Sequence, residues 1–161
     1  MLSNNTAVTA TDMLNYLVFW LSGRRILARA GVAASAGGLM ALGHPPFDLL
    51  AVGLIGLALG GVSFLSALDV KQAAWTGFWC GLGFFVVLLH WLVEPFLVYP
   101  EQDGWMAPFA LFFLSGGLAL FWAAAFAIAR RFGSLVVLCL ALTVAEGLRS
   151  YVLTGFPWGL I

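Results

Sequence analysis

Five long apolar segments constrain this chain more than any other feature of its sequence. They lie at about 26–43, 49–68, 73–93, 107–129 and 133–153. A helix needs about 20 mostly apolar residues to cross a membrane, and each segment comes close to that length. Only 9% of the 161 residues are charged, against about 25% in an ordinary soluble domain. The sequence therefore predicts an all-α membrane protein, a polytopic bundle of about five transmembrane helices.

The first 25 residues are predicted to form a separate segment on the cytoplasmic side, ahead of a transmembrane domain over residues 26–161. The apolar run at 13–21 is too short to span a membrane, but its aromatic side chains suit the headgroup layer. We therefore expect an N-terminal interfacial helix there. Pro45 and Pro46 end the first span, and a polar loop at 94–103 separates the third span from the fourth.

The basic residues indicate how this bundle is oriented. Successive loops of a five-span bundle alternate between two sides, and three regions that share one side hold six of the seven basic residues: Arg24, Arg25, Arg29, Lys71, Arg130 and Arg131. Lys and Arg mark the cytoplasmic side of a membrane protein. The N-terminus is therefore predicted to be cytoplasmic, with the 94–103 loop and the last residues outside. The formal net charge of zero gives no indication of a nucleic-acid partner.

Small residues recur within the predicted spans. They occupy most of 31–38 and also Gly77, Gly81, Gly83, Gly116 and Gly117. Small residues let helices approach closely in lipid, so we interpret these positions as sites of helix packing. The alternative is that they leave room between helices for a lipid chain or another ligand.

Glu146 and Arg149 are charged residues inside the fifth predicted span. They are three residues apart and therefore share one helix face. Charges inside a membrane usually face the bundle interior, a cavity or each other. Two roles follow: an ion pair near the outer interface that fixes the rotation of the helix, or a contact between Arg149 and a lipid phosphate. Neither role implies catalysis.

The sequence alone predicts no metal site and no catalytic centre. His90 lies one helical turn before Glu94, but two ligands fall short of the three or four that zinc usually takes. His44, beside a Pro-Pro turn, is interpreted as a loop residue. Cys80 and Cys139 lie in apolar stretches and are interpreted as packing residues.

Most tryptophans are assigned to an aromatic belt at the membrane surfaces: Trp75, Trp79, Trp91, Trp105 and Trp122. Trp158 differs, because Gly155 and Pro157 interrupt regular helix beside it. Irregular backbone near membrane depth must be covered by protein or line a wet cavity. The segment TGFPW is therefore predicted to shape a site.

Four stretches, in order along the chain, resemble the N-terminal membrane region of bacterial apolipoprotein N-acyltransferases of the alphaproteobacterial type: HPPFDLL, GFWCGLGFFVVLLHWLVEPFLV, WMAPFALFFLSGGLALFWAAAFAIARR and AEGLRSYVLTGFPWGLI. The resemblance runs from about residue 24 to residue 161. It implies an enzyme of the bacterial inner membrane that completes lipoprotein maturation. Its partners would be a phospholipid acyl donor and a diacylated lipoprotein, and it would need no cofactor.

The resemblance also implies a periplasmic nitrilase-like domain, whose Glu–Lys–Cys triad forms a thioester acyl-enzyme. No residue of this chain corresponds to that triad, since Cys80 and Cys139 lie in membrane segments. We therefore assign no catalytic residue and expect a chain that is truncated before the catalytic domain and inactive alone. The lipid- or substrate-proximal candidates are Glu146, Arg149, Phe156, Pro157 and Trp158.

Two alternatives come from other functional classes. The chain could function as a small non-enzymatic integral membrane protein that binds lipid or a partner. A transporter subunit is the third hypothesis, but that class is expected to show internal repeats and polar residues near the midplane. The sequence shows no clear repeat, so this hypothesis ranks last.

Overall fold

The computed structural model of the protein describes residues 9–152, and all regular structure in that range is helical. The elements are α1 (Ala10–Ser22), α2 (Ile26–Ala41), α3 (Leu50–Leu65), α4 (Val70–Leu88), the 3-10 helix η1 (His90–Leu97), α5 (Pro100–Asp103), the 3-10 helix η2 (Gly104–Met106), α6 (Ala107–Phe132) and α7 (Leu135–Val152). The predicted all-α class is confirmed. Phe156, Pro157 and Trp158 lie outside the described residues.

The local sequence explains where several helices begin and end. Thr9 and Asp12 form a capping box at the start of α1, and the hydrogen bond from the Thr9 hydroxyl lowers the pKa of the Asp12 carboxyl. Asp69 caps α4, accepting a hydrogen bond of 2.7 Å from the backbone nitrogen of Gln72. Gly133 ends α6 with a φ of +63°, a left-handed conformation that favours glycine.

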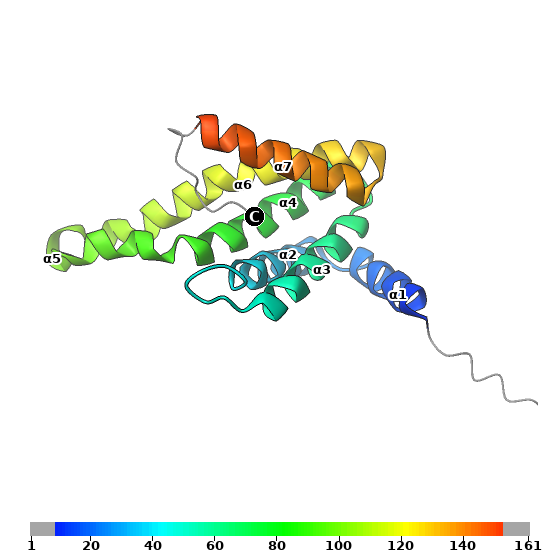
Figure 1. The fold of residues 1–161 in the computed structure, drawn as a ribbon, viewed down its shortest axis with the longest axis horizontal. Helices are drawn as coiled ribbons and strands as arrows, with labels where there is room; N and C mark the ends of the chain where they lie inside the picture. The colour runs from blue at the N-terminus through cyan, green and yellow to red at the C-terminus, as the bar shows by residue number, and fades with distance from the viewer. Residues whose placement is uncertain (1–8, 153–161) are drawn as a thin grey trace, which may run out of the picture.

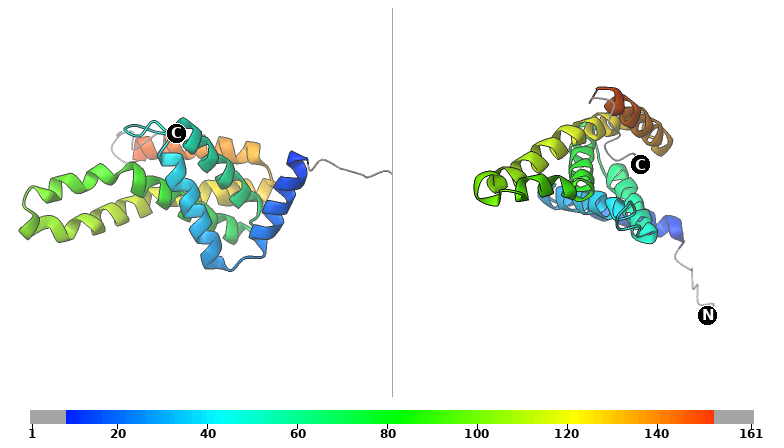
Figure 2. Two further views of the ribbon diagram at one scale, coloured as in Figure 1. Left: turned by 90° about the horizontal axis from the view of Figure 1, so that it is seen from below. Right: turned by 60° about the vertical axis from the view of Figure 1, so that its left-hand side comes forward.

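The central helix of the bundle is α4. It packs against α2 on one side and α6 on the other, while α3 contacts α2 and α7 contacts α6 (Figure 1). The order across the bundle is therefore α3, α2, α4, α6, α7, which differs from the order along the chain. The helices α4 and η1 run beside α6 as a long hairpin, and its tip at α5 projects past the other helices (Figures 1 and 2).

Glycines allow the closest approach in the bundle, between α2 and α4. A Cβ atom added at Gly37 would overlap the carbonyl oxygen of Cys80, and one added at Gly83 would overlap the carbonyl oxygen of Ala34. The predicted packing role of small residues is confirmed at these positions. Among residues 9–152 it is not borne out for Gly116 and Gly117, because a Cβ added at either would meet none of those residues within 4 Å.

The predicted polar loop at 94–103 is largely helical. The 3-10 helix η1 and the single turn of α5 cover most of it. Pro95 has no backbone N–H and cannot continue an α-helical ladder, which favours a tighter and less regular helix. The axis bends by 48° between α4 and η1, so the predicted third span at 73–93 is straight only as far as Leu88.

Helix length supports only part of the predicted membrane topology. Within the described residues, the continuous helical stretch Pro100–Phe132 is long and apolar enough to cross a membrane, and the bent pair α4–η1 would add a second crossing if it forms one span. The helices α2 and α3 have 16 residues each. At 1.5 Å per residue that is about 24 Å, less than a hydrocarbon core of about 30 Å. The structure therefore does not confirm five transmembrane helices.

The basic residues other than Arg149 lie toward one end of the bundle. Arg29 donates hydrogen bonds to Gln72 Oε1 at 2.6 Å and to the Ser66 carbonyl at 3.2 Å, and Arg130 donates to the Leu68 carbonyl at 3.5 Å. These bonds join the start of α2 and the end of α6 to the α3–α4 turn. The regions that the charge pattern placed on a common side are thus neighbours in space, while their orientation in a membrane stays a prediction.

Candidate functional site

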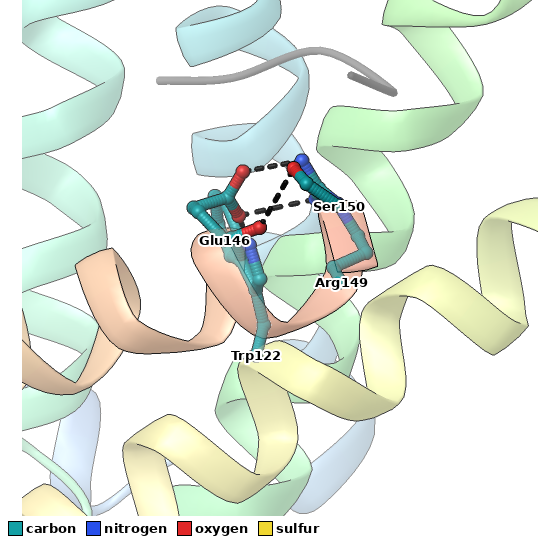
Figure 3. Close-up of polar contacts among 4 residues, drawn as sticks. All are labelled: Trp122, Glu146, Arg149 and Ser150. Carbon is teal, nitrogen blue, oxygen red and sulfur yellow. Dashed lines mark hydrogen bonds and ion pairs between the residues drawn. The ribbon is translucent and has the colours of Figure 1, made fainter. Parts of the chain in front are cut away.

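Glu146 and Arg149 bind each other on one face of α7 (Figure 3). Arg149 Nη1 donates to Glu146 Oε1 at 3.1 Å, and Nη2 donates to Oε2. Arg149 is completely buried and Glu146 is 7% exposed. Their spacing of three residues places both side chains on one helix face, as the sequence predicts. The structure therefore contains the ion pair, the first of the two roles that the sequence left open.

Trp122 of α6 completes this cluster. Its Nε1 donates a hydrogen bond of 2.9 Å to Glu146 Oε1. The indole is buried and stacks on Phe84 with ring centroids 5.1 Å apart, while Arg149 Cζ lies 4.8 Å from the centroid of the Phe85 ring. The assignment of Trp122 to an aromatic belt is therefore wrong. A buried indole N–H needs an acceptor, and the position of Trp122 well inside the 107–129 segment was the signal that pointed to one.

The cluster lies beside the middle of α6. Trp122 comes ten residues before the end of that helix at Phe132, which is about 15 Å along its axis. The position of the ion pair near the outer interface of a membrane stays a prediction, while its place beside α6 is defined by Trp122. Because both side chains are buried in the protein, each charge is balanced mainly by the other.

An apolar cavity of about 320 Å³ adjoins the cluster. The side chains of Cys80, Trp122 and Phe126, from α4 and α6, line it together with residues of α3 and α7: Leu57, Gly61, Leu138 and Leu142. Trp122 thus contributes its ring to the cavity and its N–H to Glu146. A cavity of this composition favours an apolar ligand, which gains free energy by leaving water or by filling a void.

The two histidines do not extend this site. His44 Nδ1 lies 3.2 Å from the Met40 carbonyl oxygen, and His90 Nδ1 lies 2.9 Å from the Val87 carbonyl oxygen. The hydrogen bond that the structure gives to His90 is therefore to the backbone of the preceding turn. Within residues 9–152, no group of three His, Cys, Asp or Glu side chains is placed to hold a metal ion.

Comparison with known proteins identifies the family. The family described as apolipoprotein N-acyltransferase N-terminal domain matches residues 36–161. Proteins named apolipoprotein N-acyltransferase are similar to this chain: that of Caulobacter vibrioides is 38% identical over 148 residues, covering 86% of this chain and 26% of the relative. The Rhodopseudomonas palustris protein is 40% identical over 140 residues, covering 81% and 26%. The Brucella suis protein is 36% identical over 159 residues, covering 88% and 30%.

The similarity covers most of this chain but only the N-terminal domain in the family's description. The chain spans less than a third of the length of these relatives, and the matching family description is that of an N-terminal domain. The order of motifs from HPPFDLL to LTGFPW therefore corresponds to a known family, and the alphaproteobacterial resemblance is confirmed. This chain belongs to the apolipoprotein N-acyltransferase family, with its match in the N-terminal domain.

Proposed function

We propose that this chain is the membrane portion of a phospholipid-dependent apolipoprotein N-acyltransferase. The complete enzyme would transfer an acyl chain to the N-terminal diacylglyceryl-cysteine of a lipoprotein. The observation that carries the proposal is the family match over residues 36–161. The apolar cavity between α3 and α7 supports it, because an acyl chain is a suitable occupant.

In this proposal the buried cluster has a positioning role. The ion pair and the bond to Trp122 hold α7 in one rotation against α6. That rotation keeps Leu138 and Leu142 in the wall of the cavity. Phe156, Pro157 and Trp158, which follow α7 in the sequence, are proposed to shape the entrance for the lipid substrates.

The catalytic step is proposed to occur outside this chain. The family resemblance assigns it to a Glu–Lys–Cys triad in a nitrilase-like domain, and none of the residues of this chain is assigned a catalytic role. The 161-residue chain is therefore expected to be inactive alone. It is expected to need no cofactor and no metal.

The proposed location is the bacterial inner membrane, with α2, α3, α4, α6 and α7 as spans and a cytoplasmic N-terminus. Large apolar side chains on the outer faces of the helices support contact with lipid: Phe113, Leu120 and Val136 are 61–71% exposed. Contiguous exposed apolar surface is uncommon on soluble monomers. Arg29 and Arg130 lie at the same end of the bundle, beside the α3–α4 turn, which supports a cytoplasmic location for that end.

Labelling of introduced cysteines tests this topology. In a chain carrying Cys80→Ser and Cys139→Ser, we expect Gln102→Cys to react with a membrane-impermeant maleimide on intact spheroplasts. Lys71→Cys, at the opposite end of α4, is expected to react only after the membrane is opened. Both positions are exposed in the structure, so burial would not explain a difference. The reverse labelling pattern would contradict the proposed orientation.

Acyl transfer is tested with a chimera in which this chain replaces the matching region of the Caulobacter vibrioides relative. We expect the chimera to increase the mass of a diacylated lipopeptide by one acyl chain, and the 161-residue chain to produce no such increase. A chimera with Val136→Ala should remain active, because Val136 is exposed and does not line the cavity. An inserted, folded but inactive chimera would contradict the proposal and favour the alternative of a non-enzymatic lipid- or partner-binding membrane protein.

A further inference from the structure

A second pocket, of about 250 Å³, lies at the basic end of the bundle. It shares no lining residue with the apolar cavity. Arg24, Arg29, Gln72, Trp75 and Thr76 are among its lining residues, and we refer to it as the basic pocket. It lies between the start of α2 and the first two turns of α4. Cationic and neutral hydrogen-bonding side chains in one concave site are suited to an anion.

The two arginines of the basic pocket are held differently. Arg29 is 8% exposed, and its guanidinium is fixed by bonds to Gln72 Oε1 and the Ser66 carbonyl oxygen. Arg24 is exposed, and its Cζ lies 3.8 Å from the centroid of the Trp20 ring. A guanidinium carries five N–H donors in a fixed plane, so both residues retain donors beyond these contacts. The nearby acid Asp69 accepts the capping bond from Gln72 and is close enough to Arg29 to interact with its charge, but it is not among the residues that line the pocket.

An apolar groove of about 440 Å³ continues from the basic pocket along α4 and α6. Its lining residues are Lys71, Ala74, Trp75, Phe78, Leu120 and Ala123. Trp75 lines both sites, so the polar pocket and the apolar groove meet at its ring. Lys71 adds a third positive charge at the end of the groove nearest the pocket. A free phosphate would use the pocket alone, whereas a phospholipid would use both.

We propose that the basic pocket binds the phosphodiester of an anionic phospholipid, with one acyl chain of that lipid in the groove between α4 and α6. Basic pockets between transmembrane helices on the cytoplasmic side are suited to anionic headgroups. This lipid would be a bound ligand at the cytoplasmic end and not the acyl donor. The proposal rests on the location of the chain in a membrane and is independent of acyl transfer.

The charge requirement is tested by lipid titration of the purified 161-residue chain in phosphatidylcholine nanodiscs. We expect phosphatidylglycerol to bind, and Arg24→Gln to weaken its affinity about fivefold, the factor expected for one basic residue near a headgroup. Arg25→Gln is the matched control, since Arg25 is the exposed neighbour that does not line the pocket. It is expected to change the affinity less than twofold. Equal losses in the two variants would indicate diffuse surface attraction and overturn the proposal.

A variant of the groove and a competition with inorganic phosphate distinguish a bound phospholipid from free phosphate in the basic pocket. Leu120→Trp adds bulk to the groove at a side chain that is 61% exposed, so folding is not at risk. We expect this variant to weaken phosphatidylglycerol binding, and millimolar inorganic phosphate to leave lipid binding unchanged. If inorganic phosphate displaces the lipid and Leu120→Trp has no effect, the pocket is a site for free phosphate and the proposal of a bound lipid is wrong.

Discussion

Replacing Glu146 by alanine is expected to destabilise the protein by about 3–5 kcal/mol, the cost of breaking a buried ion pair, and by more than Arg149→Ala does. In Glu146→Ala, the buried guanidinium of Arg149 loses the carboxylate that balances it. Arginine stays protonated in proteins and cannot become neutral. In Arg149→Ala, the carboxyl group of Glu146 can take up a proton and keep its bond to Trp122. The asymmetry between the two variants is the prediction.

Reversible unfolding in mixed detergent micelles measures this difference. The double variant Glu146→Ala/Arg149→Ala should be more stable than Glu146→Ala alone, because it buries no unbalanced charge. Val136→Ala is a control on the same helix, at a side chain that is 69% exposed, and should change the free energy of unfolding little. If Arg149→Ala were less stable than Glu146→Ala, the prediction would be wrong. The unbalanced charge of Arg149 would then not be the main cost of breaking the ion pair.

Gly83→Ala and Gly37→Ala are expected to separate α2 from α4. At each position the added Cβ would overlap a backbone carbonyl oxygen of the facing helix, and a backbone cannot move aside as a flexible side chain can. Overpacking typically costs 1–3 kcal/mol, and we expect about 3 kcal/mol or more at these contacts because the backbones themselves must part. Because α4 is the central helix, its contact with α6 is expected to loosen as well.

Two other glycines serve as matched controls for this prediction. An added Cβ at Gly31 in α2 or at Gly116 in α6 would meet no atom within 4 Å in the part of the chain that the structure describes. Alanine is favoured over glycine in a helix by roughly 1 kcal/mol, so Gly31→Ala and Gly116→Ala should be neutral or stabilising. Thermal unfolding of all four variants in one detergent tests the contrast. Similar melting temperatures for Gly83→Ala and Gly116→Ala would refute the role of the close approach.

The sequence predicts the helices of this protein well but not how they pack. Apolar length and polar breaks place α2, α3, α6 and α7 close to their observed bounds. Glycine stripes indicate that helices approach closely, yet they do not identify the partner. A Cβ added at Gly37 would overlap the backbone of Cys80 in α4, whereas one added at Gly116 would meet no atom of the described residues within 4 Å, although both glycines lie in similar small-residue runs. The partner depends on contacts distant in the chain, which local periodicity does not encode.

In the candidate site, too, the contact within one helix is predictable from the sequence and the contact between helices is not. The pairing of Glu146 with Arg149 is predictable because both residues lie on one helix within four positions of each other. The bond from Trp122 is not, because it joins residues 24 positions apart on different helices. The 3-10 helix His90–Leu97 and the bend between it and α4 are not predicted either, since Glu94 and Pro95 suggest a polar loop.

The helices of the bundle differ in length, and in the proposed membrane topology a bilayer of uniform thickness would not match all of them. The 26 residues of α6 extend about 39 Å, against about 24 Å for the 16 residues of α3. Lipids next to a short helix respond by thinning, at a fraction of a kcal/mol per Å of mismatch. We therefore expect the membrane to be thinnest beside α2 and α3. Headgroups there would lie closer to the level of the cavity, and an acyl chain would travel a shorter distance along the membrane normal to enter it.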